Sequence, residues 1–295
     1  MEELKYCPVC QLEKFEEFKT CIDYTVSKEH FKIVSCLQCG FKFLNPRPAI
    51  SELSKYYESD DYVSHSNTKK GLINKIYHFV KFRAIRNKIE LISELKPKNK
   101  TLLDIGCGTG DFLGKAIESG WKGIGIEPNL KARNTAINNY KSTVYDEIGL
   151  VKLPTNSFSI ISMWHVLEHV SDLNKRINDI YNLLEEGGFA VIAVPNYTSW
   201  DAKHYSSSWA AYDVPRHLYN FSPSIIKELF LKHNLHHHKS YPMKLDSFYV
   251  SMLSEKHKQS SLGLVKAFFI GLISNFKTRN DAEKYSSVIY IFQKK

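Results

Sequence analysis

The sequence predicts an α/β protein in which a mostly parallel sheet is covered by helices on both faces and is preceded by a small cysteine-bearing unit. Short apolar runs alternate with helical segments after residue 100, a glycine-rich turn follows the first of these runs, and two Cys-x2-Cys pairs stand near the start. Repeated β-α-β units imply the parallel sheet. The chain of 295 residues is 43% hydrophobic and 24% charged, which excludes wholesale disorder, collagen and a coiled coil.

The first 48 residues predict a zinc-ribbon-like unit. Cys7 and Cys10 form one pair, Cys36 and Cys39 form the second, and 25 residues separate the pairs. Four thiolates at this spacing are typical of a closed tetrahedral zinc site, which is structural because it leaves no open coordination position. A redox role for either pair is the alternative. The six cysteines are too few for a disulfide scaffold.

The N-terminal residues show neither a basic stretch nor an apolar stretch of the kind that a signal peptide requires, so we expect a cytoplasmic protein. Residues 49–98 predict a helical linker or lid. Apolar residues recur at helical spacing from Leu72 to Leu95, and Pro97 ends that helix. Its basic residues, Lys88 among them, are interpreted as a solvated face.

Residues 99–295 predict the main domain. We expect strands at 101–105, 122–126, 142–145, 158–164, 189–194 and 286–292, and helices at 112–119, 129–139, 172–184 and 223–231. Gly120 ends the first of these helices, and Pro223 occupies the first position of the last one. Residues 262–276 predict an amphipathic helix, for which packing as core or lid is favoured over peripheral contact with a membrane surface.

The glycine turn lies where the first strand of this domain meets its first helix. A dinucleotide site needs G-x-G-x-x-G, and Gly106 and Gly108 fit this pattern, but Asp111 takes the third position. A carboxylate there repels a pyrophosphate, and Asp104 adds further negative charge. The second strand ends at Glu127, whose carboxylate can accept hydrogen bonds from both ribose hydroxyls. The pattern therefore favours a ligand with a ribose and a positive centre, such as S-adenosylmethionine.

Four segments, DIGCGTGDFL, GIEPN, SFSIISMWHVLEHV and a strand ending in VPN, together resemble class I S-adenosylmethionine-dependent methyltransferases over residues 100–295. The resemblance implies a Rossmann-like sheet of seven strands, the last one antiparallel beside the fifth. It implies that the cofactor site comprises Asp104, Gly106, Cys107, Gly108, Gly110, Glu127, Pro128, Asp146 and Trp164. Asp146 matches the adenine-contacting acid only loosely, and a solvated loop acid is the alternative. Ser159 replaces an aspartate of the family pattern, which affects a local hydrogen bond.

The residues after the fourth strand supply candidate acid-base groups. His165 and His169 are four residues apart and can share a helical face. Glu168 and His169 match two of three metal ligands in the quinone-biosynthesis O-methyltransferases that this region resembles, with His165 in place of the first glutamate. A divalent ion at Glu168 and His169 is therefore one interpretation. The favoured alternative is that both residues only orient the start of the next segment.

A long insertion at residues 196–219 follows the fifth strand and is rich in Trp and Tyr. A loop of this length is usually functional, and we expect its aromatic residues, with Arg216 and His217, to line the acceptor entry. His217 is the candidate general base that we favour. The alternative is that Arg216 and His217 only fold the loop and cap the helix that begins at Ser222.

The sequence thus predicts an enzyme that methylates the oxygen or carbon of a small molecule of the sugar, quinone or surface-glycan precursor type. An RNA methyltransferase that grips phosphates with its zinc unit and net charge of +9 is the alternative. Against a nucleic-acid partner, the segment WHVLEH lacks the Asn/Asp-Pro-Pro-aromatic motif of amino-directed base methylation, and basic residues are scattered among acids in the N-terminal unit. The oligomeric state, monomer or homodimer, is left open.

Overall fold

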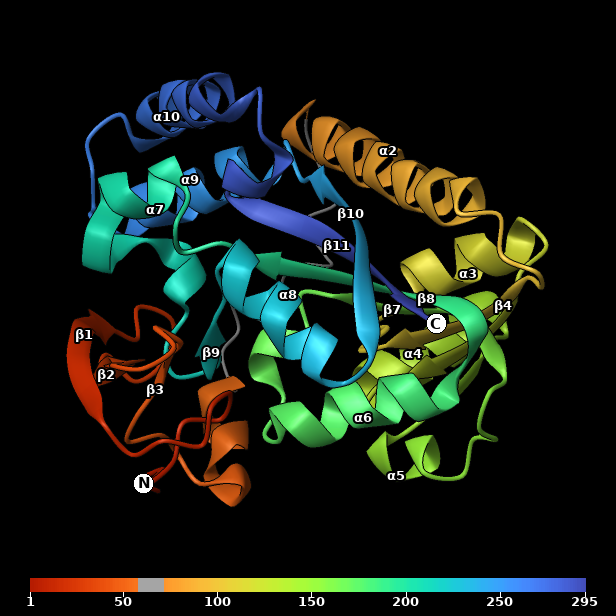
Figure 1. Ribbon diagram of the computed structural model, residues 1–295. Coiled ribbons are helices and arrows are strands. Elements are labelled where there is room, and N and C mark those ends of the chain that lie inside the picture. Colours follow the sequence, from red (N-terminus) through yellow and green to blue (C-terminus); the bar gives the residue numbers. More distant parts are fainter. Residues whose placement is uncertain (58–71) are drawn as a thin grey trace.

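The computed structural model describes residues 1–57 and 72–295, and the side chains of the first long helix from Lys81 onward. Its main feature is a seven-stranded sheet of order β10-β11-β8-β7-β4-β5-β6 (Figure 1). The strands are β4 (Thr101–Ile105), β5 (Lys122–Ile126), β6 (Thr143–Tyr145), β7 (Phe158–Trp164), β8 (Leu184–Pro195), β10 (Leu235–Pro242) and β11 (Ser287–Lys294). β11 is antiparallel to β8, whereas β4 to β8 are parallel, so the predicted Rossmann-like fold is confirmed.

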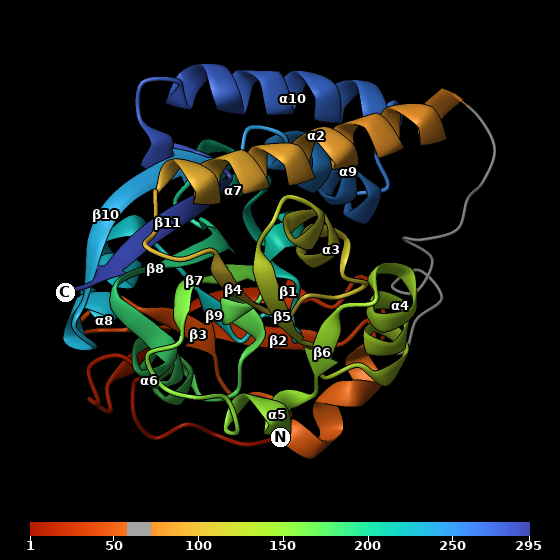
Figure 2. The ribbon, with the colours of Figure 1, turned by 90° about the vertical axis from the view of Figure 1, so that its right-hand side faces the viewer.

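Two apolar cores lie on opposite faces of this sheet because successive strand residues point to opposite sides. In β4, Leu103 belongs to one core and Leu102 to the other. The first face is covered by α6 (Leu173–Leu183) and α8 (Pro223–Lys232), and the second by α2 (Leu72–Glu94), α3 (Asp111–Glu118) and α4 (Leu130–Tyr140), as Figure 2 shows. The short helix α5 (Glu147–Leu150) follows β6.

The N-terminal unit is a second, antiparallel sheet of order β1-β2-β3-β9. It contains β1 (Phe15–Ile22), β2 (His30–Cys36) and β3 (Lys42–Leu44). The fourth strand, β9 (Tyr219–Asn220), comes from the long insertion of the main domain and pairs with β3. Phe41 stacks on Tyr219 with ring centroids 5.8 Å apart. The insertion therefore completes the sheet of the N-terminal unit.

The aromatic residues of the insertion do not form the expected open wall. The segment folds into α7 (Trp200–Tyr205) and two single 3-10 turns, and Tyr205, Trp209 and Tyr212 are buried. The indole N–H of Trp209 donates to Asp201 at 2.8 Å. These large rings fill the space between the two sheets, so burial of apolar area explains their presence.

The predicted helix near the C-terminus is α10 (Gly263–Thr278), and it packs on α9 (Asp246–His257). Of the favoured interpretations, core or lid packing, the structure contradicts core packing: the small residues of α10 are buried, and its large apolar residues are exposed. Within the described parts of the chain, no helix combines the length and apolar character that crossing a bilayer would need. The part of the predicted linker at residues 58–71 lies outside the described residues.

Candidate functional site

The glycine turn between β4 and α3 is held in left-handed conformations, with φ values of +73° at Gly106, +56° at Gly108 and +80° at Gly110. A Cβ at Gly110 would meet the Cβ of Ala136 at 2.7 Å, and one at Gly106 would collide with the side chain of Val166. A Cβ at Gly108 would meet nothing within 4 Å. Gly106 and Gly110 are therefore required by packing, whereas Gly108 borders open space beside bare backbone.

Two carboxylates lie close to the glycine turn: Asp104 in β4, just before it, and Glu127, just after β5. Asp104 is 2% exposed and accepts a hydrogen bond from Ser162 Oγ at 2.7 Å. Burial raises the pKa of Asp104 to about 7, and the charge of Glu127 adds to the rise, although Ser162 and Lys88 oppose it. The Glu127 carboxylate accepts from the backbone N–H of Gly108 at 2.9 Å and of Asn129 at 2.8 Å. Glu127, which follows β5, is therefore hydrogen-bonded directly to the glycine turn.

The Lys88 side chain does not belong to the solvated face that the sequence analysis expected. Its Nζ lies 4.2 Å from the centroid of the Trp164 ring, a cation–π distance. Burial lowers the pKa of Lys88, and the charges of Asp104 and Asp246 oppose this effect. The surroundings of Asp104 therefore already include one cation from α2. Trp164 itself packs edge-on against Phe112 at 5.3 Å.

The remaining predicted cofactor residues lie around the same turn. The Cys107 thiol packs behind it, against Gly125 of β5, and Pro128 directly follows Glu127. Asp146 follows β6 and caps α5 by accepting from the Gly149 N–H at 3.0 Å. Asp111, which takes the third glycine position, forms an ion pair with Lys81 at 2.9 Å and accepts from Thr109 and Tyr140. The charge of Asp111 is therefore balanced within the protein.

Ser159, which replaces an aspartate of the family pattern, still makes a local hydrogen bond, since its Oγ donates to the Thr101 carbonyl at 2.9 Å.

His165 stands at the end of β7 with φ +57°, a conformation that non-glycine residues adopt rarely and often at functional sites. Its Nε2 lies 3.0 Å from Asp246 and its Nδ1 lies 3.4 Å from Glu168. Burial disfavours the imidazolium, but the two carboxylates outweigh burial and raise the pKa of His165 to about 10. His165 is therefore charged at neutral pH in this state and cannot accept a proton. Sequence reasoning missed Asp246, the first residue of α9.

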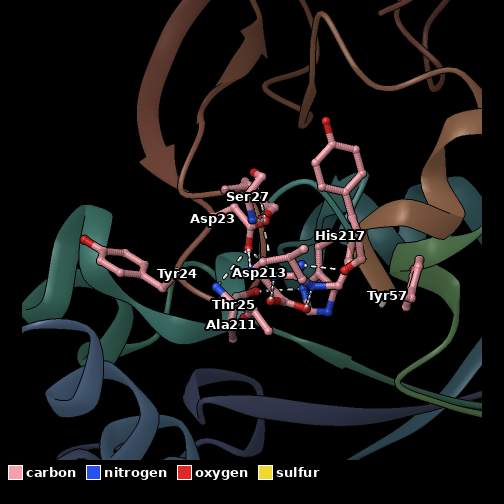
Figure 3. Close-up of polar contacts among 12 residues, drawn as sticks. Asp23, Tyr24, Thr25, Ser27, Tyr57, Ala211, Asp213 and His217 are labelled. Carbon is pink, nitrogen blue, oxygen red and sulfur yellow. Dashed lines mark hydrogen bonds and ion pairs between the residues drawn. The ribbon is translucent and has the colours of Figure 1, made fainter. Parts of the chain in front are cut away.

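A second cluster joins Glu168, His169 and His217, whose nearest ligand atoms all lie within 4.8 Å of one another. The Nδ1 of His169 lies 3.1 Å from the Arg216 carbonyl, and that of His217 lies 2.8 Å from the Ala211 carbonyl. Carbonyls only accept, so both Nδ1 atoms carry hydrogen and both Nε2 atoms keep a lone pair. Burial and the neighbouring His217 lower the pKa of His169 to about 4. Figure 3 shows His217 beside Ala211, with Tyr57 nearby.

The sequence profile of the methyltransferase domain family matches residues 77–239, more than half of the chain. The chain belongs to this methyltransferase family. The ubiquinone/menaquinone biosynthesis C-methyltransferase of Campylobacter jejuni is 28% identical over 104 residues, which cover 32% of this chain and 44% of that protein. The ubiquinone biosynthesis O-methyltransferase of Glaesserella parasuis is 32% identical over 111 residues, which cover 34% of this chain and 47% of that protein.

The chain thus spans about half the length of the curated relatives that it matches. Among solved structures, a putative sarcosine dimethylglycine methyltransferase from Galdieria sulphuraria covers 73% of this chain and 86% of its own, with a TM-score of 0.51 and 13% identity. That likeness supports the fold alone.

Arg216 does not line an acceptor entry, contrary to the sequence-based expectation. It is 1% exposed, its Nη2 lies 2.9 Å from Asp23 and 2.7 Å from Asp213, and its Nη1 donates to the Tyr56 carbonyl at 2.9 Å. Asp23 is itself held by the loop N–H groups of Thr25 and Ser27 (Figure 3). A fully paired buried guanidinium of this kind joins the N-terminal unit to the segment that carries His217.

The four predicted zinc ligands converge at the other end of the N-terminal unit. The sulfurs of Cys7 and Cys39 lie 3.6 Å apart, and those of Cys10 and Cys36 lie 3.4 Å apart. A zinc ion with bonds of about 2.3 Å to four sulfurs in a tetrahedron requires separations of about 3.8 Å. Burial opposes the Cys36 thiolate, but the N–H groups of Cys39 and Gln38 outweigh it and lower its pKa to about 7. The donor set therefore fits a structural zinc ion.

Proposed function

We propose that this protein transfers the methyl group of S-adenosylmethionine to an oxygen or carbon of a small-molecule acceptor of the sugar, quinone or surface-glycan precursor type. The observation that carries the proposal is the open space at Gly108 beside the Glu127 carboxylate, with the buried Asp104 just before the turn. Asp111 at the start of α3 places a carboxylate where a pyrophosphate would bind, which favours a cationic nucleoside. Family membership over residues 77–239 gives independent support.

In this proposal the glycine turn, with Asp104, Gly106, Cys107, Gly108 and Gly110, holds the methionine end of the cofactor. Glu127 and Pro128 hold the ribose, Asp146 lies toward the adenine, and Trp164 borders the methyl donor. When bound, the cofactor supplies an electrophilic methyl group, and the main task of the protein is to align the acceptor in line with it. The zinc-binding unit at residues 1–48 and the linker at 49–98 flank the methyltransferase domain at 99–295.

On the acceptor side, His217 takes the proton from an acceptor hydroxyl. Its Nδ1–H is directed at the Ala211 carbonyl, which leaves the Nε2 lone pair as the basic atom. His165 is held as an imidazolium whose two N–H groups face Asp246 and Glu168, so it positions these two carboxylates beside the acceptor side. His169, neutral near pH 7, supports His217 through an edge-to-face ring contact at 4.5 Å.

Cofactor affinity is expected to depend on pH through Asp104. Its pKa of about 7 in the cofactor-free protein means that a proton must leave before the carboxylate can face a cation. Protons therefore compete with the cofactor below pH 7, where affinity should fall by about tenfold per pH unit, and affinity should level off above it. Calorimetric titration of S-adenosylmethionine on both sides of pH 7 measures the slope. Asp104→Asn should bind weakly without that slope, and a flat profile in the unsubstituted protein would contradict the assignment.

Substitution of the base is expected to affect turnover rather than cofactor binding. His217→Asn keeps a side-chain N–H for the Ala211 carbonyl but removes the basic atom, so kcat should fall by about 100-fold or more. S-adenosylmethionine affinity should remain within twofold of its original value. An unchanged kcat in the variant would remove His217 from this role.

A divalent ion held by Glu168, His169 and His217 is a second candidate arrangement for the same cluster. Both Glu168 oxygens are buried and, among the described residues, have no hydrogen-bond partner beyond the 3.4 Å ion pair with His165. An orphaned carboxylate beside two imidazole lone pairs is a suitable donor set for a divalent metal. Elemental analysis distinguishes the arrangements, because this cluster would add a second metal equivalent to the one held by the four cysteines.

The acceptor class is tested by measuring transfer of a labelled methyl group to quinone precursors, nucleotide sugars and total RNA. We expect transfer to a small molecule and no salt-sensitive retention of RNA. Cations of the N-terminal unit are engaged within the protein: Lys32 pairs with Glu17 at 3.3 Å, and Lys42 lies over the Phe18 ring at 4.5 Å. Label transferred to RNA and to none of the small molecules would favour the alternative.

A further inference from the structure

Helix α10 is built with its large apolar side chains toward the outside. The residues that it buries are small: Ala267, Gly271, Ser274 and Thr278. The residues that it exposes, together with the Leu262 that precedes it, are large and apolar, and each is between 42% and 74% exposed: Leu262, Leu264, Val265, Phe268, Phe269, Leu272, Ile273 and Phe276. A surface helix of a water-soluble protein normally has the opposite arrangement. A contiguous apolar face of this size marks an interaction surface.

The contacts beneath α10 show that this orientation is specified by packing. A Cβ at Gly271 would meet the ring of Phe248 in α9 at 3.0 Å or less, so only glycine allows the two helices to approach this closely. Ser247 of α9 donates to the side chain of Asn275, and Ser274 donates to the buried Asp201 at 2.9 Å. Small and hydroxylated residues thus hold the inner face, as they do between helices in membranes. The outward apolar face is therefore a fixed feature of the fold.

The charges around this face have one sign. Between residues 244 and 279 the only two acids point inward, since Asp246 contacts His165 and Glu255 is 4% exposed. The exposed basic residues of the same stretch include Lys244, Lys258, Lys266, Lys277 and Arg279. Helix α2 lies on the same side of the molecule as α10, as Figures 1 and 2 both show. A partner surface that complements this face of α10 is apolar at its centre and anionic at its border.

We propose that the hairpin of α9 and α10 docks flat onto an anionic lipid bilayer. The large side chains of α10 enter the acyl boundary, and the surrounding lysines and arginines meet the negative headgroups. Because α9 begins at Asp246, which contacts His165, docking would bring the candidate site to the membrane surface. This inference stands on exposure and charge and is independent of the proposed reaction.

Sedimentation of the full chain with vesicles tests the proposal. We expect binding to vesicles of equal phosphatidylglycerol and phosphatidylcholine, weaker binding to phosphatidylcholine alone, and release as salt is raised. The double variant Phe269→Glu/Phe276→Glu should lose at least about tenfold in partitioning, since two buried apolar side chains are removed and two like charges are added. Lys266→Glu/Lys277→Glu should lose the preference for the anionic lipid. Ile148→Glu, at a residue 67% exposed on α5, is the matched control and should bind like the unsubstituted protein.

Circular dichroism and thermal melting confirm that each variant is folded. The proposal is overturned if the unsubstituted protein fails to sediment with phosphatidylglycerol vesicles at low salt, or if Phe269→Glu/Phe276→Glu binds as well as Ile148→Glu. It is also overturned if sedimentation velocity shows a dimer that the Phe269→Glu/Phe276→Glu variant converts to monomer while vesicles do not bind. In that case a second copy covers the face.

Discussion

Gly108→Arg is expected to abolish binding of S-adenosylmethionine while the protein remains folded. A Cβ at this position meets no atom of the protein within 4 Å, so a longer side chain can extend into the space in which we propose that the cofactor binds. The guanidinium also places a positive charge beside Asp104 and Glu127, where the cofactor brings its own. Calorimetry should find no binding at cofactor concentrations that saturate the original protein.

The matched control is Gly187→Arg. Gly187 has φ +82° and open space around its Cβ position, so an arginine there carries a similar left-handed strain of about 1–2 kcal/mol at a place far from the turn. Its melting temperature should fall as much as that of Gly108→Arg, but its cofactor affinity should not change. If Gly108→Arg retains its affinity, the cofactor does not lie across this turn.

Cys36→Ser is expected to release the zinc ion and loosen residues 1–45. A structural zinc site of this kind contributes about 10–16 kcal/mol of apparent binding free energy, which in small metal-binding units is also folding free energy. A serine hydroxyl at the same position remains protonated and is a poor zinc ligand. Elemental analysis should show the loss of one metal equivalent, and hydrogen exchange should show faster exchange throughout β1, β2 and β3.

Cys21→Ser provides the control for that experiment. Cys21 is also a buried thiol of the same sheet, at 2% exposure, but it does not belong to the group of four converging sulfurs. The Cys21→Ser variant should keep its full metal content. A full zinc equivalent bound to Cys36→Ser would show that the four-thiolate assignment is wrong.

The central strands could be predicted to the residue. The sequence analysis places strands at Thr101–Ile105, Lys122–Ile126 and Phe158–Trp164, and the structure has the same bounds. These strands lie in the middle of a parallel sheet and are largely buried on both faces, so they are short apolar runs with glycine or polar residues at the ends. The glycine turn and Glu127 were predictable for the same reason, since their positions follow from where two neighbouring strands end.

Features that depend on distant pairing were not predictable. β9 has two residues, and only its partner β3 makes it a strand. No local sequence pattern marks Asp246 as a site residue, because its role depends on a contact with the imidazole of His165, which is distant in the chain. The sequence does predict helix α10, but not which of its residues face the protein. The actual packing uses the small residues, a choice that only the shape of α9 explains.

The pairing of β9, from the main domain, with β3 of the N-terminal unit has a practical consequence for anyone who wishes to study the two parts separately. Removal of residues 1–48 would remove Phe41, which packs against the rings of Tyr219 and Phe221. These two rings would then be exposed to solvent. Asp23 would leave with the excised piece, so Arg216 would stay behind as a charge without one of its counterions. The N-terminal unit and the main domain should therefore be studied together, in the full chain.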